Sequence, residues 1–90
     1  MISLSGRLIC ANATEADLVR QHLPEHLRLT RAEPGCLSFQ VTATDDPLIW
    51  QVAESFTDKA AFEAHQSRTR ASAWHAATAH IRRDYRLTGL

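Results

Sequence analysis

EPGCLSFQVTATDDPLIWQVAESF, residues 33–56, holds two strand patterns joined by a short turn. A Pro-Gly turn at residues 34–35 comes first, and apolar and polar side chains then alternate through residues 37–42. This alternation is typical of a strand with one buried face. Residues 45–47, Asp-Asp-Pro, have the composition of a turn, and residues 48–56 form a second apolar strand. The short connection predicts that the two strands pair as an antiparallel hairpin.

A strand and a helix are expected before this hairpin. Residues 2–10 carry apolar side chains at every second position, which predicts a strand with one buried face. The apolar residues from 18 to 27 have helical spacing, and they predict a helix that ends near Arg31. Thr14, with Asp17 three residues later, is the predicted N-cap. Pro24 lies inside this helix and predicts a kink or a restart, because it has no N–H to donate and crowds the preceding turn.

A second helix and a last strand are expected after the hairpin. Asp58 is the predicted N-cap of a helix that reaches about residue 81, with a weak point at residues 66–69. Residues 81–87 alternate again and predict the final strand. The order βαββαβ predicts an α+β, ferredoxin-like split βαβ fold in a single domain, residues 1–90. In this fold both helices cover one face of a four-stranded antiparallel sheet.

The hairpin also predicts a homodimer. Its second strand is apolar on both sides near its start, whereas an antiparallel sheet with one solvated face usually alternates cleanly. A chain of 90 residues builds only a modest core. A second copy of the chain would cover the free face of the sheet, so we expect a dimer.

Composition argues against several classes of partner. Ten basic and ten acidic side chains give no net charge, and we therefore expect neither a nucleic acid nor an anionic membrane as partner. No apolar run approaches the roughly 20 residues of a membrane span, and the N-terminus lacks the features of a signal peptide. Cys10 and Cys36 lack CxxC spacing and are expected to be small core residues in a reduced, cytoplasmic protein.

Three segments together resemble a known family. They are EPGCLSFQV (residues 33–41), WQVAESFTD (50–58) and AAFEAHQS (60–67). In order and spacing they resemble the antibiotic biosynthesis monooxygenase family, and the resemblance extends over residues 1–88. It implies a dimeric α+β barrel with a small apolar pocket between each sheet and its own helices. It also implies oxidation of quinol or polycyclic aromatic substrates by O2 without metal or flavin, so no cofactor is expected; other members degrade haem, act on small signalling metabolites or have no assigned activity.

His65 and Glu54 are the predicted catalytic residues. His65 occupies the Ala-His position of the family pattern, and an imidazole near neutral pKa is suited to take a proton from a phenolic substrate. The alternative is a helix-end histidine that binds backbone carbonyls. Glu54 shares a strand face with aromatic residues, where its carboxylate needs a partner or keeps a raised pKa. It is therefore either a pocket acid or base, or a structural partner of Arg7 or Arg83.

The predicted substrate-binding residues are aromatic or cationic: Phe39, Trp50, Phe62, Arg70, Trp74 and His75. Each also has a simpler interpretation, because aromatic side chains are core residues first and Arg70 is a surface arginine first. Relatives place a second histidine where this chain has Thr69–Arg70, and Arg70 could instead hold an anionic oxygen of the substrate. His75 matches the iron ligand of haem-degrading relatives, but their asparagine and tryptophan are Gly6 and His65 here.

No metal site is expected. His75 and His80 are five residues apart, so on a helix their side chains point away from each other. His22 and His26 share a helix face but lack a third ligand. Two functions follow from the sequence. The first is a cofactor-free monooxygenase acting on a small quinol or phenolic aromatic, and the second is a non-catalytic dimeric module that binds a small hydrophobic or anionic metabolite.

Overall fold

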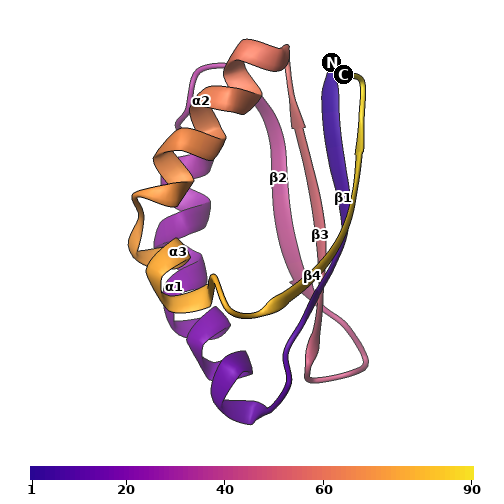
Figure 1. The fold of residues 1–90 in the computed structure, drawn as a ribbon, viewed down its shortest axis with the longest axis vertical. Helices are drawn as coiled ribbons and strands as arrows, with labels where there is room; N and C mark the ends of the chain where they lie inside the picture. Colours follow the sequence, from indigo (N-terminus) through magenta and orange to yellow (C-terminus); the bar gives the residue numbers. More distant parts are fainter.

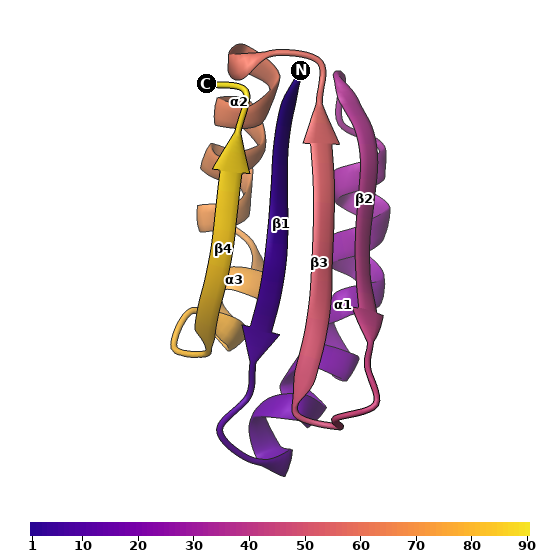
Figure 2. The same ribbon diagram turned by 90° about the vertical axis from the view of Figure 1, so that its right-hand side faces the viewer.

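The computed structural model describes residues 1–90 and consists of a four-stranded sheet with three helices on one of its faces (Figure 1). Along the chain the elements are β1 (Ile2–Ile9), α1 (Ala13–Arg31), β2 (Cys36–Ala43), β3 (Ile49–Phe56), α2 (Lys59–Arg70), α3 (Ala73–Thr78) and β4 (Arg82–Thr88). The sheet is antiparallel throughout, in the order β2-β3-β1-β4 (Figure 2). The predicted βαββαβ, ferredoxin-like fold is confirmed.

The hairpin predicted within residues 33–56 is β2 paired with β3. Its register aligns Phe39 with Glu54 and Val41 with Val52, and a bulge interrupts the pairing between Cys36 and Ser38. Along β3 the side chains alternate between buried and solvent-facing positions more cleanly than the sequence suggested. The apolar character on both sides that the sequence indicates is limited to the start of the strand, where Ile49 lies on the outer face beside Ile9 of β1.

Helix α1 begins earlier than predicted. Asn12 is the N-cap, and its Oδ1 accepts a hydrogen bond from the backbone N–H of Glu15 at 3.0 Å. The Glu15 carboxylate in turn accepts one from the N–H of Ala11 at 2.7 Å, so the pair forms a reciprocal cap. The predicted cap at Thr14 is therefore wrong. The helix continues through Pro24 to Arg31 without a restart.

The second helical region contains two helices. Asp58 caps α2 as predicted, with its Oδ1 accepting from the N–H of Ala61 at 2.8 Å. The predicted weak point at residues 66–69 is helical, and the break lies instead at residues 71–72. Ser72 causes it, because its hydroxyl caps the N-terminus of α3 through a 3.1 Å bond from the N–H of His75.

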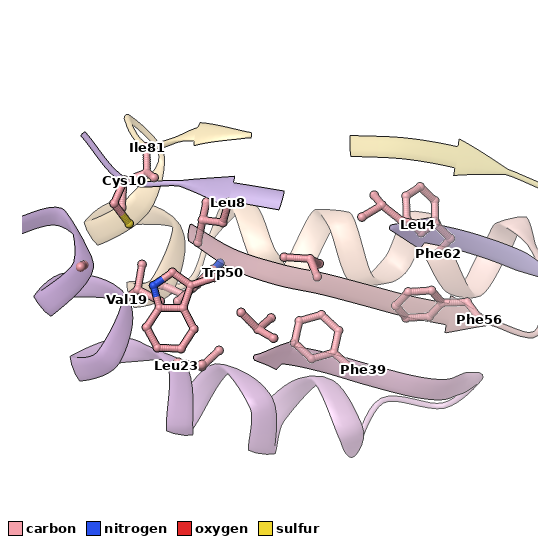
Figure 3. Close-up of a cluster of buried hydrophobic side chains, with 14 of the residues drawn as sticks. Leu4, Leu8, Cys10, Val19, Leu23, Phe39, Trp50, Phe56, Phe62 and Ile81 are labelled. Atoms are coloured by element: carbon pink, nitrogen blue, oxygen red, sulfur yellow. The ribbon is translucent and has the colours of Figure 1, made fainter. Parts of the chain in front are cut away.

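Fifteen buried apolar residues fill the space between the sheet and the helices (Figure 3). They include Leu8 and Phe56 from the sheet and Val19 from α1, all completely buried. Cys10 is buried as expected, Cys36 is half-buried, and both thiols are free.

The two chain termini lie side by side because β1 pairs with β4 (Figures 1 and 2). Gly6 sits in the middle of this pairing, opposite Tyr85, with a φ of 150°. A Cβ at this position would lie 2.1 Å from the carbonyl oxygen of Asp84. Glycine is therefore required for the two strands to approach closely.

Candidate functional site

A cavity of about 380 Å³ lies between the inner face of the sheet and the helices. This volume is within the range of ligand pockets. The strands contribute apolar side chains together with the polar Glu54, Arg83 and Tyr85, and the helices contribute mainly polar and aromatic side chains. Its lining residues are Leu4, His26, Phe39, Val41, Val52, Glu54, His65, Gln66, Thr69, Arg70, Trp74, His75, Ala79, Arg83 and Tyr85.

The imidazole of His65, on α2, is hydrogen-bonded to a carboxylate. Its ring is 2 % exposed, and its Nδ1 lies 3.0 Å from Oε2 of Glu33. Glu33 comes from the turn between α1 and β2 and is itself held by the guanidinium of Arg68, which also donates to Oγ1 of Thr30 at 2.8 Å. With Nδ1–H donating to Glu33, Nε2 is left as an acceptor. The alternative of a helix-end histidine bonded to backbone carbonyls is wrong.

Glu54 faces the opposite nitrogen of the same ring. Its Oε1 lies 3.7 Å from Nε2 of His65, and Oγ1 of Thr69 lies 3.5 Å from that nitrogen. The carboxyl is 8 % exposed, and burial together with the negative charge of Glu33 raises the pKa of Glu54 to about 7. A carboxyl with this pKa exchanges its proton near neutral pH.

Neither predicted arginine partner forms a salt bridge with Glu54. Arg7 points to the outer face of the sheet, where it pairs with Asp84 at 3.3 Å. Arg83 donates to the backbone oxygen of Thr78 at 2.7 Å and ties the end of α3 to β4. The structural interpretation of Glu54 as a salt-bridge partner of Arg7 or Arg83 is therefore wrong.

Burial also keeps His26 and His65 neutral. Desolvation lowers the pKa of His65, and the nearby Glu33 only partly opposes this effect. Desolvation, reinforced by the charge of Arg68, lowers the pKa of His26 to about 3. Both imidazoles are therefore uncharged at neutral pH, so each has one N–H and one lone pair.

Aromatic rings form the wall beside the two imidazoles. The ring of His26 stacks on Trp74 with centroids 4.8 Å apart and an angle of 3° between the planes. Phe39 meets His26 edge-on at 5.3 Å and lies 5.8 Å from His65. The wall joins α1, α3 and β2, so a flat aromatic molecule in the cavity would have rings to pack against.

Six of the eight predicted site residues line this one cavity: Phe39, Glu54, His65, Arg70, Trp74 and His75. Trp50 and Phe62 do not. Phe62 packs on Phe56 with ring centroids 5.6 Å apart, and Trp50 is 8 % exposed with its indole N–H unpartnered. No group of three or more His, Cys, Asp or Glu side chains is arranged to hold a metal ion.

The sequence alone does not assign a site role to several lining or supporting residues, notably Glu33, His26 and Tyr85. Glu33 looked like part of a turn, and nothing in the sequence indicates that the turn packs against α2. His26 did leave a signal, because it continues the buried stripe of Val19, Leu23 and Thr30 along α1. An ionisable residue in an otherwise buried stripe is a candidate site residue.

The family can now be assigned. The sequence profile named antibiotic biosynthesis monooxygenase matches residues 4–77. The chain belongs to this family. No protein of curated function matches it. None of its helices combines the length and the apolar composition that a membrane span requires.

Solved structures agree with this assignment. A protein from Nitrosomonas europaea, provisionally named an antibiotic biosynthesis monooxygenase, superposes with a TM-score of 0.80 at 16 % identity, covering 99 % of this chain and 97 % of the other. A protein from Deinococcus radiodurans with the same provisional name gives 0.76 at 26 % identity, with coverages of 98 % and 88 %. A second Nitrosomonas europaea protein, of unknown function, gives 0.77 at 23 % identity, with coverages of 99 % and 87 %. All three structures share the fold of this chain, although one of them has no assigned function.

Proposed function

We propose that this protein is a cofactor-independent monooxygenase that oxidises a small quinol or phenolic aromatic with O2. The observation that carries the proposal is the neutral His65, whose Nδ1 is hydrogen-bonded to Glu33 and whose acceptor nitrogen Nε2 lies 3.7 Å from the cavity-lining Glu54. Family membership supports the reaction class. The cavity supports the substrate class, because its aromatic and apolar walls suit a flat ring.

The chemistry begins with removal of a proton. Nε2 of His65 accepts the proton of the phenolic hydroxyl, and the Glu33 carboxylate stabilises the imidazolium that forms. The electron-rich phenolate then passes one electron to O2, and the two radicals combine at a ring carbon to give a peroxide. Loss of water leaves a second carbonyl on the ring, so one oxygen atom enters the product and the other leaves as water. No external reductant is needed, because the substrate supplies all the electrons.

Two further side chains that line the cavity can assist the oxidation. Glu54, with a pKa of about 7, can give a proton to the peroxide and so promote the loss of water. Arg70 lines the cavity, and its positive charge would stabilise a phenolate that forms there. The roles predicted for Glu54 and Arg70 thus remain part of the proposal, as does substrate binding by His75, which lines the same cavity.

An oxygen electrode tests the proposal with a panel of quinols and naphthols. We expect oxygen uptake by the wild-type protein and a loss of at least about 100-fold in His65→Ala, the scale of a missing general base. His80→Ala is the matched control, because His80 is an exposed histidine outside the cavity. Uptake no greater than buffer with every substrate would reject the reaction, and stabilisation by a ligand that is recovered unchanged would instead indicate the non-catalytic binding module.

We also propose that the protein is a homodimer in which the outer faces of two sheets meet. The chain itself places no layer over this face (Figure 2). Small or polar side chains such as Ser5, Gln51 and Ala53 lie there, so a second sheet can approach closely. Light scattering at micromolar concentration should give twice the chain mass, and a monomer mass would reject the dimer.

The free thiols of Cys10 and Cys36 suit a reducing, cytoplasmic location.

A further inference from the structure

His26 is an unusual residue to find in the buried stripe of α1. The side chain is 4 % exposed, and its Nδ1 is fully enclosed without any hydrogen-bond partner. A buried polar atom without a partner destabilises a fold, whereas an apolar side chain of similar shape would not. The imidazole therefore does not contribute to stability through this nitrogen, and the reason for its presence lies on the other side of the ring.

That other side faces the cavity. His26 is one of the lining residues, and enclosure of Nδ1 leaves Nε2 as the nitrogen able to reach an occupant. The neutral imidazole carries a single hydrogen. An enclosed nitrogen with no acceptor beside it is less costly as a bare lone pair than as an N–H, so the hydrogen belongs on Nε2.

The two imidazoles then have opposite roles. Nδ1–H of His65 is engaged by Glu33, and its Nε2 is an acceptor, whereas Nε2 of His26 is a donor. Their ring centroids are 6.1 Å apart, and Trp74 holds the His26 ring by stacking. The cavity thus offers an acceptor and a donor close together on one wall.

We propose that His26 is a substrate-binding residue that donates a hydrogen bond from Nε2 to an oxygen of the ligand. The cavity consequently selects an aromatic that carries a second oxygen substituent besides the hydroxyl that His65 deprotonates. This inference rests on the proposed function for the role of His65. The binding preference itself holds whether or not the bound molecule is oxidised.

The preference can be measured without oxygen. Naphthol and its dihydroxynaphthalene isomers are titrated into the protein under nitrogen by calorimetry. The wild-type protein should bind at least one diol about 10-fold more tightly than naphthol, the factor expected of one added hydrogen bond in a buried site. His26→Phe should remove this preference while keeping naphthol binding within about 3-fold. His26→Gln, whose amide N–H falls near the position of Nε2, should restore part of it.

Two further readouts separate this role from a structural one. His26→Phe should melt no lower than the wild-type protein, because it removes an enclosed nitrogen that has no partner; a structural histidine would give a large fall in Tm. Nitrogen-15 NMR should show the His26 hydrogen on Nε2. His22→Phe, on the same helix but outside the cavity, is the matched control.

The outcomes distinguish the two proposals. Equal diol preference in wild type and His26→Phe, a hydrogen on Nδ1, or no binding of either probe by the wild-type protein overturns the role of His26. A diol preference that depends on His26 supports it even when no oxygen uptake occurs in air. In that case only the monooxygenase reaction fails.

Discussion

Ionisation of the buried Glu54 should make the stability of the folded protein depend on pH. Burial raises its pKa from 4.5 to about 7 in the folded protein. The folded state therefore binds this proton more tightly than the unfolded state, and stability falls as pH rises between these two values. At about 1.4 kcal/mol for each tenfold change in proton affinity, ionisation of Glu54 costs roughly 3 kcal/mol above pH 8.

The substitution Glu54→Gln removes this cost. The distance of 3.7 Å between Glu54 and His65 is too long for a hydrogen bond, so the substitution breaks none there. Near pH 4 both proteins carry a neutral side chain, and their stabilities should be similar. Near pH 9 the variant should be more stable by roughly 3 kcal/mol, which for a domain of this size corresponds to roughly 12 to 24 °C in Tm.

Urea unfolding followed by circular dichroism, at pH 4 and pH 9, measures the effect. The difference in unfolding free energy between variant and wild type is compared at the two pH values. This cancels the titration of His26 and His65, which makes both proteins less stable as the pH falls. Their lowered pKa values mean that stability falls as pH drops below about 6.5. Glu63→Gln makes the same change of charge on an exposed position of α2 and serves as the control. A Glu54→Gln difference that is equal at the two pH values would refute the reasoning.

Three other substitutions test particular contacts. Gly6→Ala should lower the free energy of unfolding by at least ~2 kcal/mol in urea titrations, because its Cβ would clash with β4; a neutral effect would contradict the close approach of the strands. Asp58→Ala should cost about 1 kcal/mol in the same assay through loss of the α2 cap, and Asp58→Asn should recover most of it. Glu33→Gln should lower the pKa of His65 further in an NMR titration, since the Glu33 charge opposes the effect of burial; an unchanged or raised pKa would show that the carboxylate does not act on the ring.

Sequence reasoning located most of the fold because the deciding signals are local. Alternation and turn composition define the hairpin, and Asp58 sits directly before its helix. The N-cap of α1 was misplaced because Asn12 and Thr14 are both good caps, and only the reciprocal bond of Glu15 with Ala11 decides between them. Pro24 suggested a restart, but the surrounding helix continues through it.

The site was harder to predict because it depends on contacts between distant segments. His65 and Glu33 are 32 residues apart, and no periodicity connects them. Trp50 and Phe62 were expected at the pocket because they are aromatic, yet their strand and helix positions direct them into the core instead. The type of a side chain indicates the chemistry that it can perform. Its position in the site depends on tertiary packing, here the packing of α2 against the turn after α1.

The adjacency of the two termini bears on how the chain folds. The β2–β3 hairpin closes between Ala43 and Trp50, whereas the β1–β4 pairing begins between Ile9 and Arg82 and therefore closes a loop about ten times longer. Loop-closure entropy makes that step more costly by roughly 2 kcal/mol, so we expect β4 to be the last strand to join the sheet. A circular permutant that joins the ends and opens the chain at residues 45–46 would make this slowest pairing a local one, while every strand keeps its neighbours.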